Sequence, residues 1–141
     1  MFYCDTSALM KLYVQEVHSE MMRRVCVDSD TVVVSDITWV EMRSALAQRV
    51  RTHQTSNLEA QKALAKLRTE WQAYQGLSLD ESLFELAGNH TEAFGLRAYD
   101  SVQLASAQRF NIALRGQMTF CCFDKQLNNA AKVLGMKVLD F

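Results

Sequence analysis

Proline is absent from this sequence of 141 residues, and its five glycines are scattered along the chain. Turns must therefore form at glycine, asparagine, aspartate and serine, and no glycine-rich loop is present that could cradle a nucleotide phosphate. Long apolar runs are also missing, since none approaches the ~20 residues that a membrane-spanning helix needs. Asp5 interrupts the N-terminus before the apolar core of a signal peptide can form. The sequence therefore predicts a soluble, cytoplasmic protein with no membrane partner.

Cysteine and histidine are too sparse, and too irregularly spaced, to suggest a zinc site or a histidine-based triad. The two sets are Cys4, Cys26, Cys121, Cys122, His18, His53 and His90. None of the cysteines forms a C-x-x-C pair, and two of them lie in apolar runs that are typical of buried strands. We therefore expect reduced thiols in the core. The histidines are expected at the surface.

An excess of basic charge is also lacking. The chain has 15 Lys and Arg against 16 Asp and Glu, which gives a net charge of −1. This balance argues against a domain that coats nucleic acid non-specifically, although it leaves room for an enzyme that holds RNA through a local patch and bound cations. With 49% hydrophobic residues, the chain can build a real core, and residues 1–141 have the size of one domain.

Short apolar runs alternate with long amphipathic stretches, which predicts an α/β protein with a parallel sheet. The predicted strands are Phe2–Cys4, Thr31–Val34, Gly76–Leu79, Met118–Phe123 and Lys137–Leu139. The predicted helices are Ser7–Val14, Val17–Val27, Ile37–Val50, Leu58–Tyr74, Glu81–Phe94, Ser101–Phe110 and Gln126–Leu134. The third and fourth helices are expected to pair as a hairpin.

Each predicted strand is followed by an aspartate: Asp5, Asp36, Asp80, Asp124 and Asp140. In open parallel sheets, sites form beyond the carboxyl ends of the strands, where the strand order reverses. The first strand is commonly central in such sheets. Asp5 is therefore the best site candidate from topology, and Asp124 is its best partner if the fourth strand lies beside the first.

Helix capping is the alternative explanation for these aspartates, because an aspartate before a helix often serves only as an N-cap worth ~1 kcal/mol. Asp5, Asp36 and Asp124 each precede a predicted helix. Asp100, with Gln103 three residues later, resembles a capping box. Glu41 lies away from the apolar stripe of its helix and on periodicity alone would be solvated.

Four acidic segments, in this order and at similar separations, resemble the signature of PIN domains. They are Asp5-Thr6-Ser7 after a short strand, Glu41 in the helix that continues to Ser44-Ala45-Leu46, Arg97-Ala98-Tyr99-Asp100 followed by Leu104-Ala105-Ser106-Ala107, and Phe123-Asp124 followed by Leu127. The third segment is the most specific match. The resemblance covers the whole chain and is greatest to the short VapC-like branch.

The resemblance implies a three-layer α/β/α sandwich around a parallel sheet of about five short strands. It also implies an endoribonuclease that leaves a 5′-phosphate and a 3′-hydroxyl, and that is the toxin of a toxin–antitoxin pair. The partners implied are an RNA substrate, a cognate antitoxin protein and a second copy of the chain in a homodimer.

Four carboxylates in one pocket would repel each other strongly, and a hard divalent cation would relieve that repulsion. Mg²⁺ prefers oxygen ligands, and Mn²⁺ can substitute for it. The resemblance makes Asp5 and Asp100 the principal metal ligands, with Glu41 and Asp124 contributing directly or through water. Ser7 would supply a supporting hydroxyl, or would instead form only a hydrogen bond at the start of its helix.

Two competing functions fit parts of the pattern. A phosphohydrolase of the haloacid-dehalogenase type also begins with a strand and an aspartate, but it needs a second aspartate at the position of Ser7. A non-catalytic PIN-like module for RNA binding or assembly would keep the fold without the chemistry. Because all four acidic positions are occupied, the sequence favours a catalytic site.

Basic residues near the expected helical hairpin could border an RNA groove, although runs of charge are usually only solvated surface. They are Arg43, Arg49, Arg51, His53, Lys62, Lys66 and Arg68. Arg97 lies one helical turn before Asp100 and could contact a substrate phosphate. We expect it, however, to be a solvated surface arginine.

Overall fold

The protein is described by a computed structural model over residues 1–27, 29 and 31–141. Five parallel strands form one sheet in the order β3-β2-β1-β4-β5. They are β1 (Phe2–Cys4), β2 (Val32–Ser35), β3 (Gln75–Leu77), β4 (Thr119–Cys121) and β5 (Lys137–Val138). The first strand is central and the fourth lies beside it, as predicted. The strand order therefore reverses between β1 and β4.

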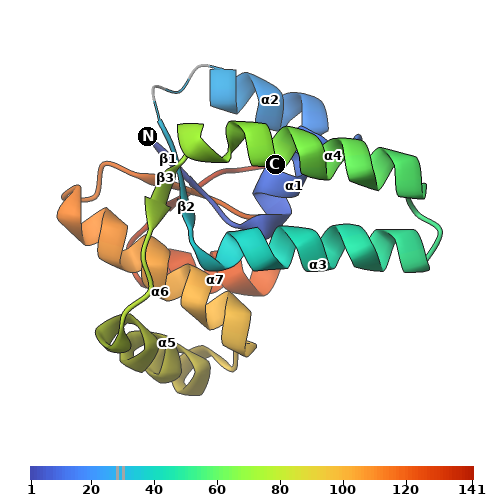
Figure 1. The fold of residues 1–141 in the computed structure, drawn as a ribbon. Helices are drawn as coiled ribbons and strands as arrows, with labels where there is room; N and C mark the ends of the chain where they lie inside the picture. The colour runs from blue at the N-terminus through green and yellow to red at the C-terminus, as the bar shows by residue number, and fades with distance from the viewer. Residues whose placement is uncertain (28, 30) are drawn as a thin grey trace.

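Helices cover both faces of this sheet and complete three layers (Figure 1). They are α1 (Thr6–Tyr13), α2 (Ser19–Val27), α3 (Ile37–Arg51), α4 (Asn57–Glu70), α5 (Glu81–Phe94), α6 (Ala98–Ala113) and α7 (Lys125–Val133), with a short 3₁₀ turn η1 (Trp71–Ala73) after α4. The helices α1 to α4 pack on one face, while α6 and α7 pack on the other with α5 outside α6. This confirms the predicted sandwich. None of the helices in the described ranges is long and apolar enough to cross a membrane.

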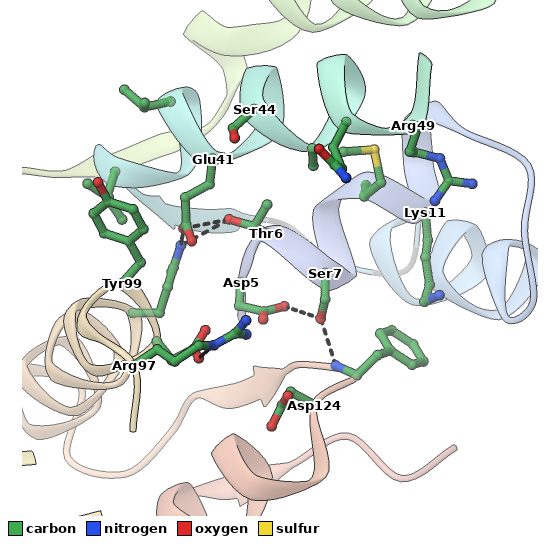
Figure 2. Close-up of a pocket in the computed structure, with 18 of the residues that line it drawn as sticks. Asp5, Thr6, Ser7, Lys11, Glu41, Ser44, Arg49, Arg97, Tyr99 and Asp124 are labelled. Atoms are coloured by element: carbon green, nitrogen blue, oxygen red, sulfur yellow. Dashed lines mark hydrogen bonds and ion pairs between the residues drawn. The ribbon is translucent and has the colours of Figure 1, made fainter. Parts of the chain in front are cut away.

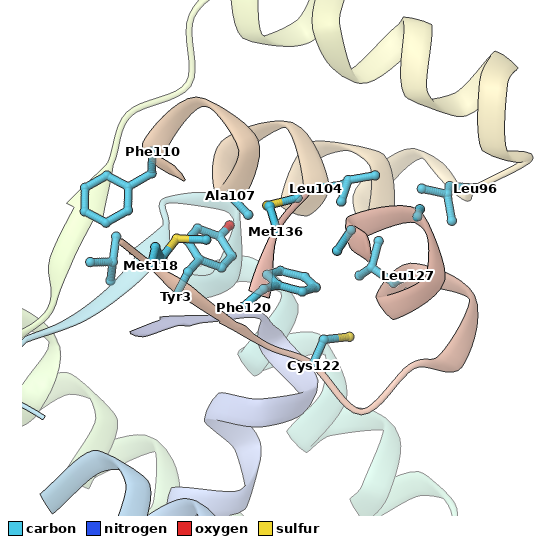
Figure 3. Packing of buried hydrophobic residues seen from close by; sticks show 13 residues of the cluster. Tyr3, Leu96, Leu104, Ala107, Phe110, Met118, Phe120, Cys122, Leu127 and Met136 are labelled. Carbon is cyan, nitrogen blue, oxygen red and sulfur yellow. The ribbon is translucent and has the colours of Figure 1, made fainter. Parts of the chain in front are cut away.

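The alternation of side chains along each strand divides the core in two. Successive strand residues point to opposite faces of a sheet. One face carries Tyr3, Val33 and Phe120, which pack against α6 and α7, as Figure 3 shows for the two aromatic residues. The other face carries Cys4, Val34 and Cys121, which pack against α1 to α4. The two cysteines are therefore buried core thiols, as predicted, and all four cysteines are free.

Most predicted helices are correct to within a few residues, and the largest differences have local causes. The predicted helix at 58–74 ends earlier, because the chain tightens into η1, where Trp71 packs edge-on against Trp39 with ring centroids 5.0 Å apart. The helix predicted from Ser101 begins at Ala98, with Arg97 at the N-cap position. The expected capping box at Asp100 is therefore wrong.

Two further predictions are also wrong. Asp36 does not cap α3, because its own backbone is already helical and its side chain makes no capping hydrogen bond. His90 is buried rather than at the surface, and its Nε2 atom lies 2.7 Å from Oε1 of Gln108, so that it joins α5 to α6. The expectation of a surface histidine failed because α6 is itself covered by α5, which gives α5 a buried face.

Leu104 on α6 tests the packing of the helix against the sheet. Its side chain is fully buried, whereas Ile112 on the same helix is 68% exposed. We predict that Leu104→Ala lowers the free energy of unfolding by about 2 to 5 kcal/mol, because it removes buried methyl groups and leaves a cavity. The matched control Ile112→Ala should change it by less than about 0.5 kcal/mol. Urea unfolding measures both, and equal effects would contradict the arrangement of α6.

Candidate active site

One pocket opens at the carboxyl ends of β1 and β4, where the strand order reverses. Its volume is about 720 Å³, and its walls come from the beginning of α1, one face of α3, the beginning of α6 and the segment after β4. All five predicted site residues line it: Asp5, Ser7, Glu41, Asp100 and Asp124. Figure 2 shows acidic side chains entering this space from several elements. Residues far apart in the sequence therefore meet because their elements end at the same edge of the sheet.

Asp5 lies deepest, with only 6% of its surface exposed. Its Oδ1 atom accepts hydrogen bonds from the backbone N–H of Ala8 at 2.9 Å and from the hydroxyl of Ser7 at 2.8 Å. Its Oδ2 atom accepts from the thiol of Cys122 at 3.1 Å. Burial raises the pKa of this carboxyl to about 6; the three hydrogen bonds oppose the rise, and the nearby carboxylate of Glu41 adds to it. Asp5 is thus both the N-cap of α1 and a desolvated acid in the pocket.

Glu41 is partly buried and held by two donors from other elements. The hydroxyl of Thr6 donates to its Oε2 atom at 2.7 Å, and the amide of Gln103 donates to the same oxygen. Gln103 is itself buried, since it also accepts from the hydroxyl of Tyr3 at 2.7 Å and donates to Thr38 at 2.9 Å. Periodicity alone placed Glu41 in solvent. Gln103 was missed, and its only signal was its place one turn after Asp100 on the same helix.

Asp100 in the first turn of α6 is paired with Arg97. The guanidinium Nε of Arg97 lies 2.7 Å from Oδ2 of Asp100, and the two side chains are 83% and 21% exposed. The hydrogen bond to Asp100 raises the pKa of Arg97, and the charges of Asp124 and Glu41 add to the rise. The expectation of a solvated surface arginine is therefore confirmed, although Arg97 also forms an ion pair with Asp100. Arg97 reaches solvent, but its charge lies beside the acidic residues.

Asp124 and Ser7 join the loop after β4 to the helices around the pocket. The Oδ1 atom of Asp124 accepts from the backbone N–H of Leu127 at 2.9 Å, so Asp124 caps α7 while it also lines the pocket. Ser7 donates to Asp5 and accepts from the backbone N–H of Phe123 at 2.8 Å. The capping and site interpretations of these aspartates are therefore compatible. Ser7 both orients an acid and fixes the neighbouring loop.

The charges that line the pocket leave a formal excess of two negative units. Five are acidic and three are basic: Asp5, Glu16, Glu41, Asp100 and Asp124 against Lys11, Arg49 and Arg97. The oxygen donors suit a hard divalent cation, whose charge would balance this excess. Within residues 1–27, 29 and 31–141, however, no three acidic, histidine or cysteine side chains are already gathered around one point. The site therefore fits a divalent ion by the chemistry of its donors and by its negative charge, part of which Arg97 already neutralises.

Comparison with known proteins agrees with this arrangement. The family profile "PIN domain" matches residues 2–133, and the chain belongs to that family. It is 33% identical over 137 residues to Ribonuclease VapC46 of Mycobacterium tuberculosis, across 97% of this chain and 95% of that protein. Its fold is similar to the crystal structure of FitAcB from Neisseria gonorrhoeae, with a TM-score of 0.70, 15% identity, and coverage of 99% of this chain and 97% of that one. It is also similar to a toxin–antitoxin complex from Klebsiella pneumoniae, with a TM-score of 0.66, 16% identity and the same coverage.

The burial of Asp5 predicts an unusual dependence of stability on pH. Its pKa of about 6 in the folded protein exceeds the ~3.9 of an unfolded aspartate. The stability that Asp5 contributes is therefore fully present below about pH 4 and is lost as the pH rises through 6. In EDTA, Asp5→Asn should become more stable than the wild type as the pH rises from 4 to 7, by on the order of 3 kcal/mol. Denaturant unfolding at a series of pH values measures this difference.

Asp80 provides a control, because its effect on stability should depend on pH in the opposite direction to that of Asp5. The hydrogen bond from Arg109 holds the pKa of this exposed carboxyl well below its usual range. Its contribution is present at neutral pH and is lost as the pH falls. Asp80→Asn should therefore be less stable than the wild type at pH 7, and the difference should shrink on acidification. If the difference in the free energy of unfolding between Asp5→Asn and the wild type stays constant from pH 4 to 7, Asp5 is not desolvated.

Proposed function

We propose that this protein is a metal-dependent endoribonuclease and acts as the toxin of a toxin–antitoxin pair. The observation that carries the proposal is the set of four carboxylates that line one pocket at the switch point of a PIN-family sheet. The substrate class follows from the similarity to Ribonuclease VapC46 along almost the entire chain. A small-molecule phosphohydrolase would not explain the similarity to a ribonuclease. A non-catalytic module would not explain why all four acidic positions are occupied and line one pocket.

Mg²⁺ is the proposed cofactor, with Mn²⁺ as a substitute, because every carboxylate donor in the pocket is a hard oxygen ligand. Asp5 and Asp100 would be the principal ligands, and Glu41 and Asp124 would contribute directly or through water. When bound, the ion supplies a Lewis acid and lowers the pKa of water beside a phosphodiester. The four carboxylates and Arg97 together have a formal charge of −3, most of which one such ion would offset.

The residues of the chain would position this chemistry before substrate arrives. Ser7 and Cys122 fix the two oxygens of Asp5, while Gln103 fixes Glu41 from the core. Preorganised groups lower a barrier because they need no reorientation during the reaction. In the proposed reaction, a water oxygen would bond to phosphorus and lose a proton, the bond from phosphorus to the 3′ oxygen would break, and the departing 3′ oxygen would take up a proton. The products would carry a 5′-phosphate and a 3′-hydroxyl.

A cognate antitoxin would inhibit the enzyme at this pocket. The similar fold from Klebsiella pneumoniae belongs to a toxin–antitoxin complex. A basic side chain from the inhibitor could pair with the acidic residues in place of the metal, since charge-assisted hydrogen bonds to carboxylates are strong. Arg97 already makes such a contact with Asp100 within this chain. We further propose that the protein acts in the cytoplasm and forms a homodimer, as the resemblance to small PIN toxins implies.

The cleavage reaction tests the proposal directly. Purified protein should cut RNA in Mg²⁺ or Mn²⁺, and EDTA should stop it. Asp100→Asn should reduce kcat by at least about 100-fold, because it removes a proposed ligand. Asp36→Asn, at an exposed aspartate outside the pocket, should leave activity unchanged. Full activity of Asp100→Asn with retained fold would exclude the assignment, and hydrolysis of small phosphoesters alone would favour the phosphohydrolase.

Metal binding without substrate is tested by thermal melts. Mg²⁺ should raise the melting temperature of the wild type, because the unfolded chain has no assembled site. It should leave that of Asp100→Ala almost unmoved. Asp100 is the informative position, since it does not cap a helix, whereas Asp5 and Asp124 do. An equal rise for both proteins would place the ion elsewhere, and no rise for the wild type would argue for a non-catalytic module.

A further inference from the structure

The pocket is electrostatically divided along its length. One face of α3 lines it from Glu41 to Arg49, and α1 lines it from Asp5 to Lys11. Eight residues of helix separate the two ends on α3, which corresponds to about 12 Å. In Figure 2, Lys11 and Arg49 lie together at the end away from Arg97 and Asp124. The groove between α1 and α3 therefore has an acidic end, where cleavage is proposed, and a basic end.

Lys11 forms the buried part of the basic end. Only 7% of the residue is exposed. Its ammonium group donates to Oε1 of Glu16 at 2.8 Å and to the carbonyl of Val17 at 3.0 Å, and it lies 4.3 Å from the centre of the Phe123 ring. These contacts occupy the ammonium group and hold its charge in one place.

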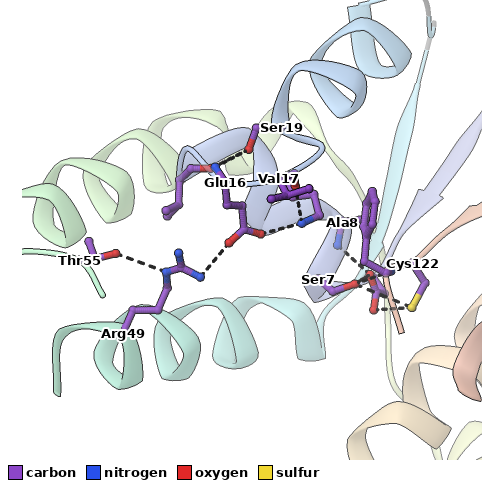
Figure 4. A network of polar contacts seen from close by, with 12 residues as sticks. Ser7, Ala8, Glu16, Val17, Ser19, Arg49, Thr55 and Cys122 are labelled. Atoms are coloured by element: carbon purple, nitrogen blue, oxygen red, sulfur yellow. Dashed lines mark hydrogen bonds and ion pairs between the residues drawn. The ribbon is translucent and has the colours of Figure 1, made fainter. Parts of the chain in front are cut away.

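Arg49 forms the accessible part, with 23% of its side chain exposed. Its Nη1 atom donates to Oε2 of Glu16 at 2.8 Å and its Nε atom to the hydroxyl of Thr55 at 3.3 Å, as Figure 4 shows. Among the described residues, its Nη2 atom has no hydrogen-bond partner. Two cations thus share the single carboxylate of Glu16, which leaves a formal charge of +1 facing the groove.

A purely structural role explains only part of this arrangement. The shared carboxylate does tie the segment between α1 and α2 to α3. Apolar side chains could make such a link equally well, because the cost of removing three charged groups from water cancels much of the attraction between them. It also explains neither the surplus positive charge nor its position on the wall of the groove. Both features suit the binding of an anion.

We propose that Arg49, with the charge of Lys11 behind it, binds a backbone phosphate of the RNA strand near the bond that is cleaved. The inference rests on the proposed function and adds a second subsite to it. A separation of about 12 Å spans no more than three to four nucleotides at 3.4 Å per stacked nucleotide. Glu16 holds the two cations in place when RNA is absent and competes with the phosphate for them.

Salt-dependent binding tests this subsite separately from cleavage. All proteins carry Asp100→Asn, and a fluorescent single-stranded RNA oligonucleotide is titrated in Mg²⁺ at several salt concentrations. Each phosphate contact on a single strand contributes about −0.7 to the slope of log K against log salt concentration. Adding Arg49→Gln should weaken binding several-fold and make the slope less steep by about 0.7. Arg51→Gln is the matched control, since Arg51 is exposed on the same helix outside the pocket, and it should change neither.

Glu16→Gln separates the phosphate role from a structural one, because the two predict opposite signs. It breaks the Arg49–Glu16 ion pair, as Arg49→Gln does, and the Lys11–Glu16 pair as well, so that it frees both cations. A phosphate subsite predicts tighter RNA binding for Glu16→Gln, and Arg49→Lys should keep the slope of the parent. A structural role predicts that Glu16→Gln weakens binding as Arg49→Gln does.

Three results would overturn the subsite: an unchanged slope for Arg49→Gln, an equal change for Arg51→Gln, or weaker binding by Glu16→Gln. Failure of the proposed function would be recognised separately, because the wild-type protein would then not cleave RNA in Mg²⁺. Melting curves of every variant confirm the fold before binding is compared.

Discussion

The burial of one carboxylate at the end of the central strand is the constraint on which the rest of the site depends. Asp5 follows β1 directly and has almost no contact with water. A charge in that position is unfavourable unless donors surround it. The backbone of α1, the hydroxyl of Ser7 and the thiol of Cys122 supply three. The start of α1 and the loop after β4 are therefore fixed in relation to one another by Asp5, the same group that we propose as a metal ligand.

The second acid depends on the core in a similar way. Glu41 points toward the pocket because Gln103 reaches it from α6 and Thr6 from α1. Gln103 also accepts from the hydroxyl of Tyr3 on the central strand. Buried polar groups of this kind are stable only when their partners are present, so the network fixes the spacing of α1, α3 and α6. The geometry of the acidic end is thus built into the packing of the sheet and its helices.

The two ends of the groove between α1 and α3 differ in the sign of their charge. Arg97 lies beside the acidic residues, while Lys11 and Arg49 lie at the far end and share Glu16. The chain as a whole has a net charge of only −1, so the proposed recognition of RNA would rely on such local asymmetry rather than on overall attraction. A strand whose phosphates follow the groove would meet positive charge at one end and the proposed metal site at the other.

The sequence by itself determined the elements and their order, because the alternation of apolar runs and amphipathic stretches is local information. It also placed Asp5 and Asp124 together, since neighbouring parallel strands end at one edge of the sheet. The ordered acidic segments indicated the family before any contact was known. Helix ends were less certain: α6 begins three residues before the predicted start, and Asp36 failed as a cap because its backbone conformation was set by the turn after β2.

Only the tertiary structure decided what each polar side chain faces. His90 is buried because α5 packs on another helix, which no periodicity within α5 reveals. Glu41 is partly buried and points into the pocket, where Gln103, sixty-two positions later in the sequence, donates a hydrogen bond to it. Arg97 and Arg49 line the pocket and pair with carboxylates there, which their sequence positions alone do not reveal. Side-chain partners of this kind are set by how elements pack, and packing depends on contacts between distant parts of the chain.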